Sequence, residues 1–169
     1  MRLHWHRRDL RVADNRGLAA VDDETIPVFV FDPDILEHGA PPRVVFLLDA
    51  LRSLRAAYRE RGSDLLAVEG DPRVVLPELA GEHDADLVTW CEDYSGLARE
   101  RDAAVRRALA DAGIERRAVQ DAVHHEPGAI TTNAGDPYKV FTYFSKKWHD
   151  REKAAPANPP EADDLAGVS

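Results

Sequence analysis

Three arginines and two aspartates gather close behind the first apolar run of the chain. The segment Arg7-Arg8-Asp9-Leu10-Arg11 is followed by Asp14-Asn15, which can cap a short helix. Arginine presents a planar fork that pairs with carboxylates, so an Arg–Asp network could order this turn or form an interdomain contact. The arginines could also bind a phosphate, but the chain has neither a Gly-x-Gly-x-x-Gly segment nor a Walker-type loop. We therefore favour the network.

Histidines and the single cysteine are the other side chains with chemical potential. His4 and His6 lie two residues apart, a spacing compatible with a metal ion, but no third ligand stands nearby in the sequence. We therefore expect both in the core or at an interface. His124-His125 has no converging Cys or Asp pattern, and two acidic residues follow Cys91, which disfavours a reactive thiolate. No catalytic residue and no metal ligand is predicted.

The elements that position these residues follow from the apolar pattern. Short apolar runs alternate with longer segments of helical period, and the runs cover residues 3–6, 27–31, 65–68, 87–90 and, more weakly, 117–120. This alternation predicts an α/β fold with a doubly wound, five-stranded parallel sheet of the Rossmann type. Ligands usually bind at the carboxyl edge of such a sheet, and the arginine-rich turn falls at that edge.

Three helices are expected between the runs. Apolar residues recur at steps of three and four over residues 44–58, and Gly62 ends this helix. Asp71-Pro72 combines a capping acid with a proline at the first helical position. A third helix is expected over residues 95–112, where charges alternate in sign as on a solvated face.

Length and charge limit the class of protein. With 169 residues and 44% hydrophobic content, the chain is expected to form a single domain. No apolar stretch reaches the ~20 residues of a membrane span, and a lone cysteine is compatible with a reducing cytoplasm. The net charge of −9 would repel DNA phosphates. We expect a cytoplasmic protein that does not bind membranes and lacks a DNA groove of its own.

The last third of the chain is less regular. The pattern breaks down after Asp121, and aromatic residues then gather over residues 138–148. Such a group leaves an exposed apolar patch unless it covers the core or meets a partner. The end of the chain is rich in alanine, proline and acidic residues. We expect residues 1–150 to form the α/β domain and residues 151–169 to be an acidic Pro/Ala-rich linker or tail.

Several separated motifs resemble those of DNA photolyases and cryptochromes. They occur in the order found in the amino-terminal α/β domain of that family and extend over about residues 1–150. The motifs are Trp5-His6-Arg7-Arg8-Asp9-Leu10-Arg11 with Asp14-Asn15, Val28-Phe29-Val30-Phe31-Asp32-Pro33, Arg43 with Phe46-Leu47-Leu48, Gly62-Ser63, Gly70-Asp71-Pro72, Trp90 with Asp93-Tyr94, Arg101-Asp102, and Pro137-Tyr138-Lys139-Val140-Phe141-Thr142.

The resemblance implies that this chain corresponds to one domain of a larger protein. Family members join such a domain to a larger helical domain, which carries FAD and the DNA groove and is absent here. In that domain, photoexcited reduced FAD gives an electron to a pyrimidine dimer flipped out of DNA, or serves blue-light signalling. The expected partner is therefore an FAD-binding helical domain, missing or separate. DNA would be reached only through it, and this chain alone should be inactive in repair.

The role implied for this chain is that of an antenna, which holds a second chromophore and passes its excitation to FAD. The expected pigment is 8-hydroxy-5-deazaflavin, with methenyltetrahydrofolate or FMN as alternatives. Aligned with the motifs of the family, the pocket would use Phe29 as an apolar wall and Arg43 as a donor at the mouth of the long helix. Asp93 and Arg101 would be its polar partners.

Two departures from the family pattern adjoin this pocket. Cys91 stands where asparagine is common, and Ser95-Gly96 replaces an acidic residue and a proline. They leave the identity of the pigment open. Because one fold can host unrelated functions, a stand-alone nucleotide- or small-ligand-binding protein is a second interpretation. A third is a partner that docks onto a separate helical flavoprotein.

Overall fold

Five parallel strands form the centre of the molecule. The computed structural model describes residues 1–168. Its strands are β1 (Arg2–His6), β2 (Thr25–Phe31), β3 (Leu66–Glu69), β4 (Leu87–Cys91) and β5 (Glu115–Val119). Their spatial order is β3-β2-β1-β4-β5, and all four neighbouring pairs are parallel. The predicted doubly wound α/β fold is confirmed.

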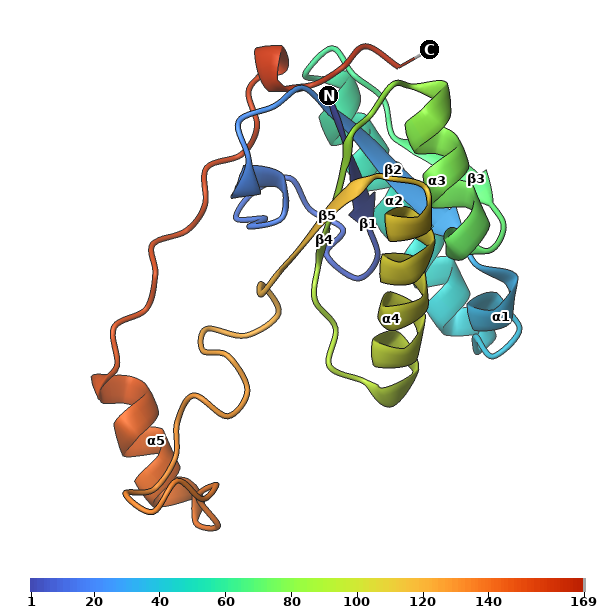
Figure 1. The fold of residues 1–169 in the computed structure, drawn as a ribbon. Helices are drawn as coiled ribbons and strands as arrows, with labels where there is room; N and C mark the ends of the chain where they lie inside the picture. The colour runs from blue at the N-terminus through green and yellow to red at the C-terminus, as the bar shows by residue number, and fades with distance from the viewer. Residues whose placement is uncertain (169) are drawn as a thin grey trace.

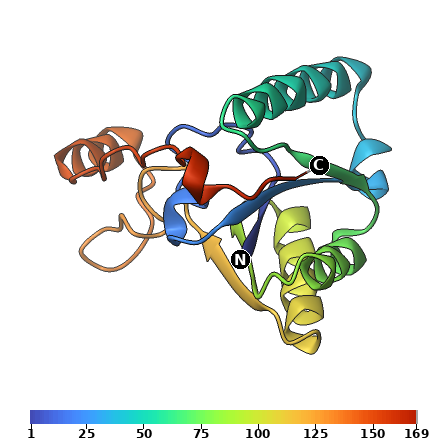
Figure 2. The ribbon, with the colours of Figure 1, turned by 90° about the horizontal axis from the view of Figure 1, so that it is seen from above.

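Helices cover both faces of this sheet (Figure 1). The helices of the described chain are α1 (Pro33–Leu36), α2 (Pro41–Arg59), α3 (Pro72–Glu82), α4 (Gly96–Asp111) and α5 (Phe141–Asp150), with short 3-10 helices at Leu18–Ala20 and Ala162–Asp164. Of these, α5 does not cover the sheet. Figure 2 shows α2 on one face of the sheet and α3 with α4 on the other. The three helices that the sequence predicts are α2, α3 and α4.

Local sequence signals set the ends of these helices. The Asp71 side chain accepts a hydrogen bond from the backbone N–H of Arg73 where α3 begins, and Ser95 caps α4 in a similar way. Gly62, just beyond α2, has a φ of +81°, which glycine adopts without steric cost. The helix α2 begins three residues before the predicted apolar stripe, because Pro41 is well suited to the first helical turn.

The apolar core lies in two clusters, one on each face of the sheet. Leu3 and Trp5 of β1 belong to the cluster beneath α3 and α4. Phe29 of β2 and Tyr58 of α2 belong to the cluster beneath α2. Strand β1 is buried along its whole length. Since side chains alternate along a strand, His4 and His6 lie on the α2 side.

His4 and His6 are core residues, as predicted, but the structure adds a third group that the spacing did not reveal. Asp9 Oδ2 lies 3.4 Å from His4 Nε2 and 3.4 Å from His6 Nδ1. The remaining ring nitrogens contact the hydroxyls of Thr89 (2.9 Å) and Tyr58 (2.6 Å). Every ring nitrogen of the pair therefore has a protein partner, which fits a structural network.

Burial and hydrogen bonding fix the charge state of this network. Burial, together with the neighbouring His6, lowers the pKa of His4 from 6.5 to about 4. Burial alone would raise the pKa of Asp9, but hydrogen bonds from His4 and His6 hold it well below its ordinary value. Asn15 donates a further hydrogen bond of 2.9 Å to Asp9 Oδ2. An ionised Asp9 therefore accepts hydrogen bonds from His4, His6 and Asn15.

The carboxyl-terminal segment leaves the sheet and then returns to it. Figure 1 shows α5 standing apart from the sheet, with the tail running back toward the edge where the chain begins. Leu165 and Ala166 are buried, and Ala166 N–H donates to the carbonyl of Thr25 at 2.9 Å. Ser63 donates to the carbonyl of Ala166 at 2.6 Å. Most of residues 151–168 are solvated, as expected for a linker. Leu165 and Ala166 differ, because they pack on the α/β domain.

None of the helices in residues 1–168 is both long enough and apolar enough to span a membrane.

Candidate functional site

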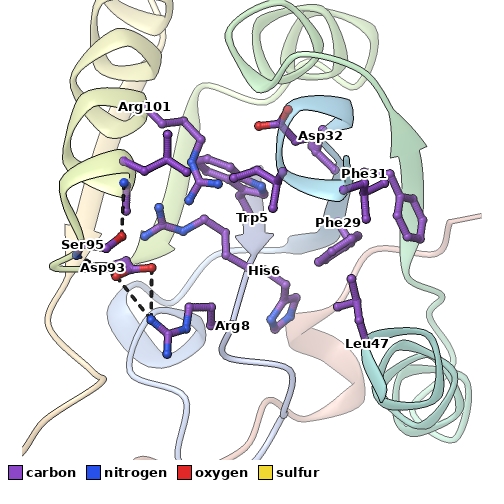
Figure 3. A pocket seen from close by; sticks show the side chains of 16 residues that line it. Trp5, His6, Arg8, Phe29, Phe31, Asp32, Leu47, Asp93, Ser95 and Arg101 are labelled. Carbon is purple, nitrogen blue, oxygen red and sulfur yellow. Dashed lines mark hydrogen bonds and ion pairs between the residues drawn. The ribbon is translucent and has the colours of Figure 1, made fainter. Parts of the chain in front are cut away.

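A cavity of about 270 Å³ opens at the carboxyl edge of the sheet, between α2 and α4, and is called the ring cavity below. Figure 3 shows polar side chains from the β4–α4 turn and α4 on one side and apolar side chains from β2 and α2 on the other. Its lining includes Trp5, Phe29, Leu47, Asp93 and Arg101. A slot with apolar walls and a few polar groups is typical of sites for planar ligands.

Trp5 and Phe29 form the apolar body of the ring cavity. Trp5 precedes the last residue of β1 and belongs to the cluster beneath α3 and α4, whereas Phe29 of β2 pairs with His6 in the sheet and belongs to the cluster beneath α2. The Phe29 ring meets that of Phe31 edge to face, with 5.0 Å between ring centroids. Both Trp5 and Phe29 are at least nine-tenths buried, so their rings are held in place by the core behind them.

Arg101 brings a partly buried positive charge to the ring cavity. Its guanidinium carbon lies 5.2 Å from the centroid of the Trp5 ring, and that of Arg7 lies 4.9 Å from it. Burial lowers the pKa of Arg101. Its Nε–H is buried without a hydrogen-bond partner in the described part of the chain, and Asp102 Oδ1 lies 4.0 Å away, beyond hydrogen-bond reach. Arg101 therefore has a donor to offer to a ligand.

Asp93 supplies a carboxylate on the same side of the cavity as Arg101 (Figure 3). It accepts a hydrogen bond of 3.1 Å from the backbone N–H of Ser95 and contacts Arg8 Nη1 at 3.4 Å. Burial alone would raise its pKa, but these contacts lower it. Asp93 is therefore an ionised acceptor, suited to bind hydroxyl groups.

Three of the four residues that the family resemblance implies come together around this cavity. Phe29, Asp93 and Arg101 line it, whereas Arg43 is exposed in the first turn of α2 and does not. Leu47 lies four residues further along the same face of α2, and it lines the cavity at the place expected for Arg43. Trp5 and Leu47 also line the cavity and were not predicted as site residues, although both lie inside the motifs shared with the family.

The arginine-rich turn forms the predicted ion-pair network. Arg7 pairs with Asp102 and also donates to the carbonyl of Cys91. Arg8 pairs with Asp93, as described above. Arg11 pairs with Asp121, with Arg11 Nη2 2.7 Å from its carboxylate. The turn after β1 is thereby fastened to the segments that follow β4 and β5.

Neither of the other candidate groups builds a reactive centre. Burial raises the pKa of the Cys91 thiol, which therefore stays protonated, as the acidic neighbours of this residue led us to expect. His124 and His125 pack with their rings 5.6 and 5.9 Å from that of Trp148, next to α5.

Comparisons with known proteins agree with this geometry. A family model described as DNA photolyase matches residues 2–162. A deoxyribodipyrimidine photo-lyase of Halobacterium salinarum is 55% identical over 98% of this chain, and an uncharacterized 31.6 kDa protein of a Synechococcus strain is 44% identical over 99%. The chain spans 37% of the length of the first relative and 63% of the second.

Solved structures show the same fold. An archaeal photolyase from Sulfolobus tokodaii, described as containing two FAD molecules, matches 99% of this chain with a TM-score of 0.85 and 25% identity. The chain covers 38% of that protein. A cryptochrome of Synechocystis has a TM-score of 0.81 at 19% identity, a likeness of fold alone. Because the family model matches residues 2–162, nearly the whole of this chain, the chain belongs to the DNA photolyase family.

Proposed function

We propose that this chain is a light-harvesting module, which holds a planar pigment in the ring cavity. The observation that carries the proposal is the pairing of an apolar slot with a buried, unpartnered donor: Trp5 and Phe29 form the slot, and Arg101 Nε–H borders it. Buried polar groups are rarely left without a partner, and a ring oxygen of a pigment would supply one. A bound pigment would absorb near-ultraviolet or blue light and pass its excitation to FAD.

Each residue of the proposed site has a separate task. Phe29 and Leu47 exclude water from one side of the ring, and Trp5 closes the cavity beneath it. Arg101 orients the pigment by donating to a ring oxygen, and Asp93 accepts hydrogen bonds from hydroxyl groups of its side chain. Arg43 lies one helical turn from Leu47 on the same helix face, so we assign it an outer contact at the mouth.

We propose 8-hydroxy-5-deazaflavin as the pigment, with methenyltetrahydrofolate and FMN as alternatives. The donor and acceptor positions suit a tricyclic ring with carbonyl oxygens and a hydroxylated side chain. The related Sulfolobus tokodaii protein is described as holding two FAD molecules with the implication of a novel light-harvesting cofactor. That description supports a flavin-type ring in this part of the family.

The activity of the whole protein would need a second part. We propose that residues 1–150 form the antenna domain and that an FAD-binding helical domain, joined or separate, is its partner. The chain spans little more than a third of the Halobacterium salinarum photo-lyase, which leaves room for such a domain there. In this proposal DNA is bound and repaired only through that partner.

A titration with 8-hydroxy-5-deazaflavin tests the proposal. The purified chain should take up the pigment saturably, with a shift of its near-visible absorption band. Asp93→Asn should weaken binding about tenfold, because a charged acceptor is replaced by a neutral one. Asp111→Asn, an exposed position on α4, is the matched control and should bind like the unmodified chain. Absence of saturable uptake of any deazaflavin, folate or flavin would contradict the proposal.

A further inference from the structure

His4, His6 and Asp9 have the composition and spacing of a metal site, which is called the β1 site below. Each residue offers one ligand atom, and these three atoms lie within 4.8 Å of one another. The side chains are buried, with exposed fractions of 0%, 0% and 7%. The spacing of the two histidines is compatible with a metal ion but lacks a third ligand in the sequence. The turn after β1 brings Asp9 to them as that ligand.

The separations between the ligand atoms of the β1 site fit one bound ion. Asp9 Oδ2 lies 3.4 Å from His4 Nε2 and 3.4 Å from His6 Nδ1. Hydrogen bonds between nitrogen and oxygen are usually about 2.7–3.2 Å long, so both contacts are long for hydrogen bonds. Ligand atoms that bind one Zn²⁺ at about 2.0–2.2 Å stand about 3.3–3.6 Å apart in a tetrahedron. The backbone carbonyl of Asp9, 3.0 Å from His6 Nδ1, can serve as a fourth ligand.

Asp9 is a buried negative charge with no cationic side chain paired to it. Among residues 1–168, its ion-pair partners are His4 and His6 alone. Burial lowers the pKa of His4 to about 4, so this ring is neutral. Asp9 is nevertheless ionised, because hydrogen bonds hold its pKa well below the ordinary value. Buried charges in proteins are usually paired with an opposite charge or coordinate a metal ion, and a divalent cation would supply the positive charge here.

Two hydroxyl groups hold the histidine rings from behind. A ligating histidine usually donates its other ring N–H to a second protein group, which fixes the orientation of the ring. His4 Nδ1 lies 2.9 Å from the hydroxyl of Thr89, and His6 Nε2 lies 2.6 Å from the hydroxyl of Tyr58. Thr89 belongs to β4 and Tyr58 to α2, so both rings are anchored to neighbouring elements.

The carboxylate of Asp9 is also held in place. Its Oδ1 accepts a hydrogen bond of 3.0 Å from the backbone N–H of Arg7. Its Oδ2 faces the two histidine rings and accepts a hydrogen bond of 2.9 Å from Asn15. Ligating carboxylates usually have hydrogen-bond donors of this kind around them. The ligand groups are therefore oriented before an ion binds, which lowers the entropic cost of binding.

We propose that His4, His6 and Asp9 bind one Zn²⁺ ion, which fastens the turn after β1 to the sheet. Imidazole nitrogens combined with oxygen ligands suit this ion. Because the ligand residues are buried, the ion would be shielded from solvent, as in structural zinc sites. When no ion is bound, the hydrogen-bond network described above holds the same side chains. The inference is independent of the proposed antenna role, because it needs no pigment.

Zinc content and thermal unfolding of the full chain test the proposal. The chain, prepared without an affinity tag, is unfolded in urea with EDTA and refolded with or without ZnCl₂, because a buried site fills most readily during folding. Elemental analysis after removal of free metal should find one Zn²⁺ per chain. The Tm should rise by about 5–10 °C when Zn²⁺ is present at about a hundredfold above its Kd.

Two variants locate the ion at the β1 site. Asp9→Asn keeps the size of the side chain but removes its charge, so it should weaken Zn²⁺ binding at least about hundredfold and abolish the rise in Tm. Thr89→Val removes the hydroxyl behind His4 and should weaken Zn²⁺ binding about tenfold to hundredfold. Circular dichroism of the metal-free variants shows whether they fold. If Asp9→Asn does not fold, Thr89→Val decides the question.

Another group of histidines provides the control. His124 and His125 lie with His149 around the ring of Trp148. The double variant His124→Gln and His125→Gln should keep the zinc content and the rise in Tm of the unmodified chain. Zinc that is lost in this control but kept in Asp9→Asn and Thr89→Val would overturn the inference. So would a refolded chain that holds no zinc and has the same Tm with and without Zn²⁺.

Discussion

Arg101 lowers the stability of the ligand-free protein and favours the binding of a ligand. A buried charge with an unpartnered Nε–H costs free energy in the ligand-free protein, and a ligand oxygen would recover that cost. Trp5 offsets part of the cost, because the guanidinium stands over its ring. Residues kept at the expense of stability are often functional.

We predict that Arg101→Met weakens pigment binding at least about tenfold without destabilising the fold. The free energy of unfolding should stay unchanged or rise by up to about 1 kcal/mol, because the methionine keeps an apolar stem and needs no partner. Pigment titration and urea unfolding of the same sample measure both quantities. Arg107→Met, exposed on α4, is the matched control. A loss of stability greater than that of the control would mean that Arg101 serves the fold.

His4 gives the protein a stability that depends on pH. Its pKa is about 4 in the folded chain and 6.5 ordinarily, so between these values the unfolded state binds more protons. The free energy of unfolding should therefore rise with pH across this window, by about 3 kcal/mol at most. Urea unfolding at several pH values measures the slope, and NMR of the His4 ring gives its protonation directly. Protonation of His4 near its ordinary pKa would contradict the account.

Among single residues, sequence reasoning succeeded where a residue type has one favourable environment. Two histidines on a central strand had to be satisfied in the core, and arginines among aspartates had to pair. It placed Arg43 at the mouth of the pocket, and this role stays a prediction, because the motif gives the helix but not the depth of each turn below the rim of the cavity. Sequence reasoning overlooked Trp5, because the alternation of side chains along a strand does not reveal which face of the sheet borders a cavity.

The bounds of the strands and of the three predicted helices could be predicted to within a few residues. The exceptions are segments whose structure depends on contacts with residues far away in the sequence. Strands β1 and β2 are buried on both faces, so their apolar runs stand out. Strand β5 has an exposed first half and gave a weak signal. The return of the tail to the sheet was missed, because proline and acidic residues are typical of linkers and the docking of Leu165 depends on Thr25, 140 residues earlier in the chain.

We predict that Leu165→Ala lowers the free energy of unfolding by about 2–3 kcal/mol. Leu165 is 7% exposed and belongs to the cluster that contains Phe29 and Tyr58, so its truncation leaves a cavity there. Val45→Ala, at an exposed position on α2, should cost far less. Both values come from urea unfolding followed by circular dichroism. Equal, small effects would mean that residue 165 belongs to a solvated linker after all.

The net charge of the whole molecule disfavours contact with DNA. The net charge is −9, and the four lysines all lie between residues 139 and 153, in and around α5. The arginines of the carboxyl edge are occupied by aspartates. The net negative charge therefore disfavours the binding of DNA phosphates.

We predict that the chain alone, supplied with FAD and light, does not restore pyrimidine dimers in DNA. The reason is that the proposed repair chemistry belongs to an FAD-binding helical domain, which is distinct from the α/β fold formed by residues 1–168. An assay of dimer content before and after illumination measures this, and a photolyase that includes the helical domain is the positive control. Light-dependent repair by the chain itself would contradict the assignment of separate antenna and repair domains.

The most direct test of the central claim is a crystal structure of this chain with 8-hydroxy-5-deazaflavin bound. The central claim predicts the pigment ring between Trp5 and Leu47, a ring oxygen within hydrogen-bond distance of Arg101 Nε, and hydroxyl groups of the pigment's side chain at Asp93. Pigment found elsewhere on the molecule, or a ring cavity filled by the side chains of Phe29 and Leu47, would contradict it.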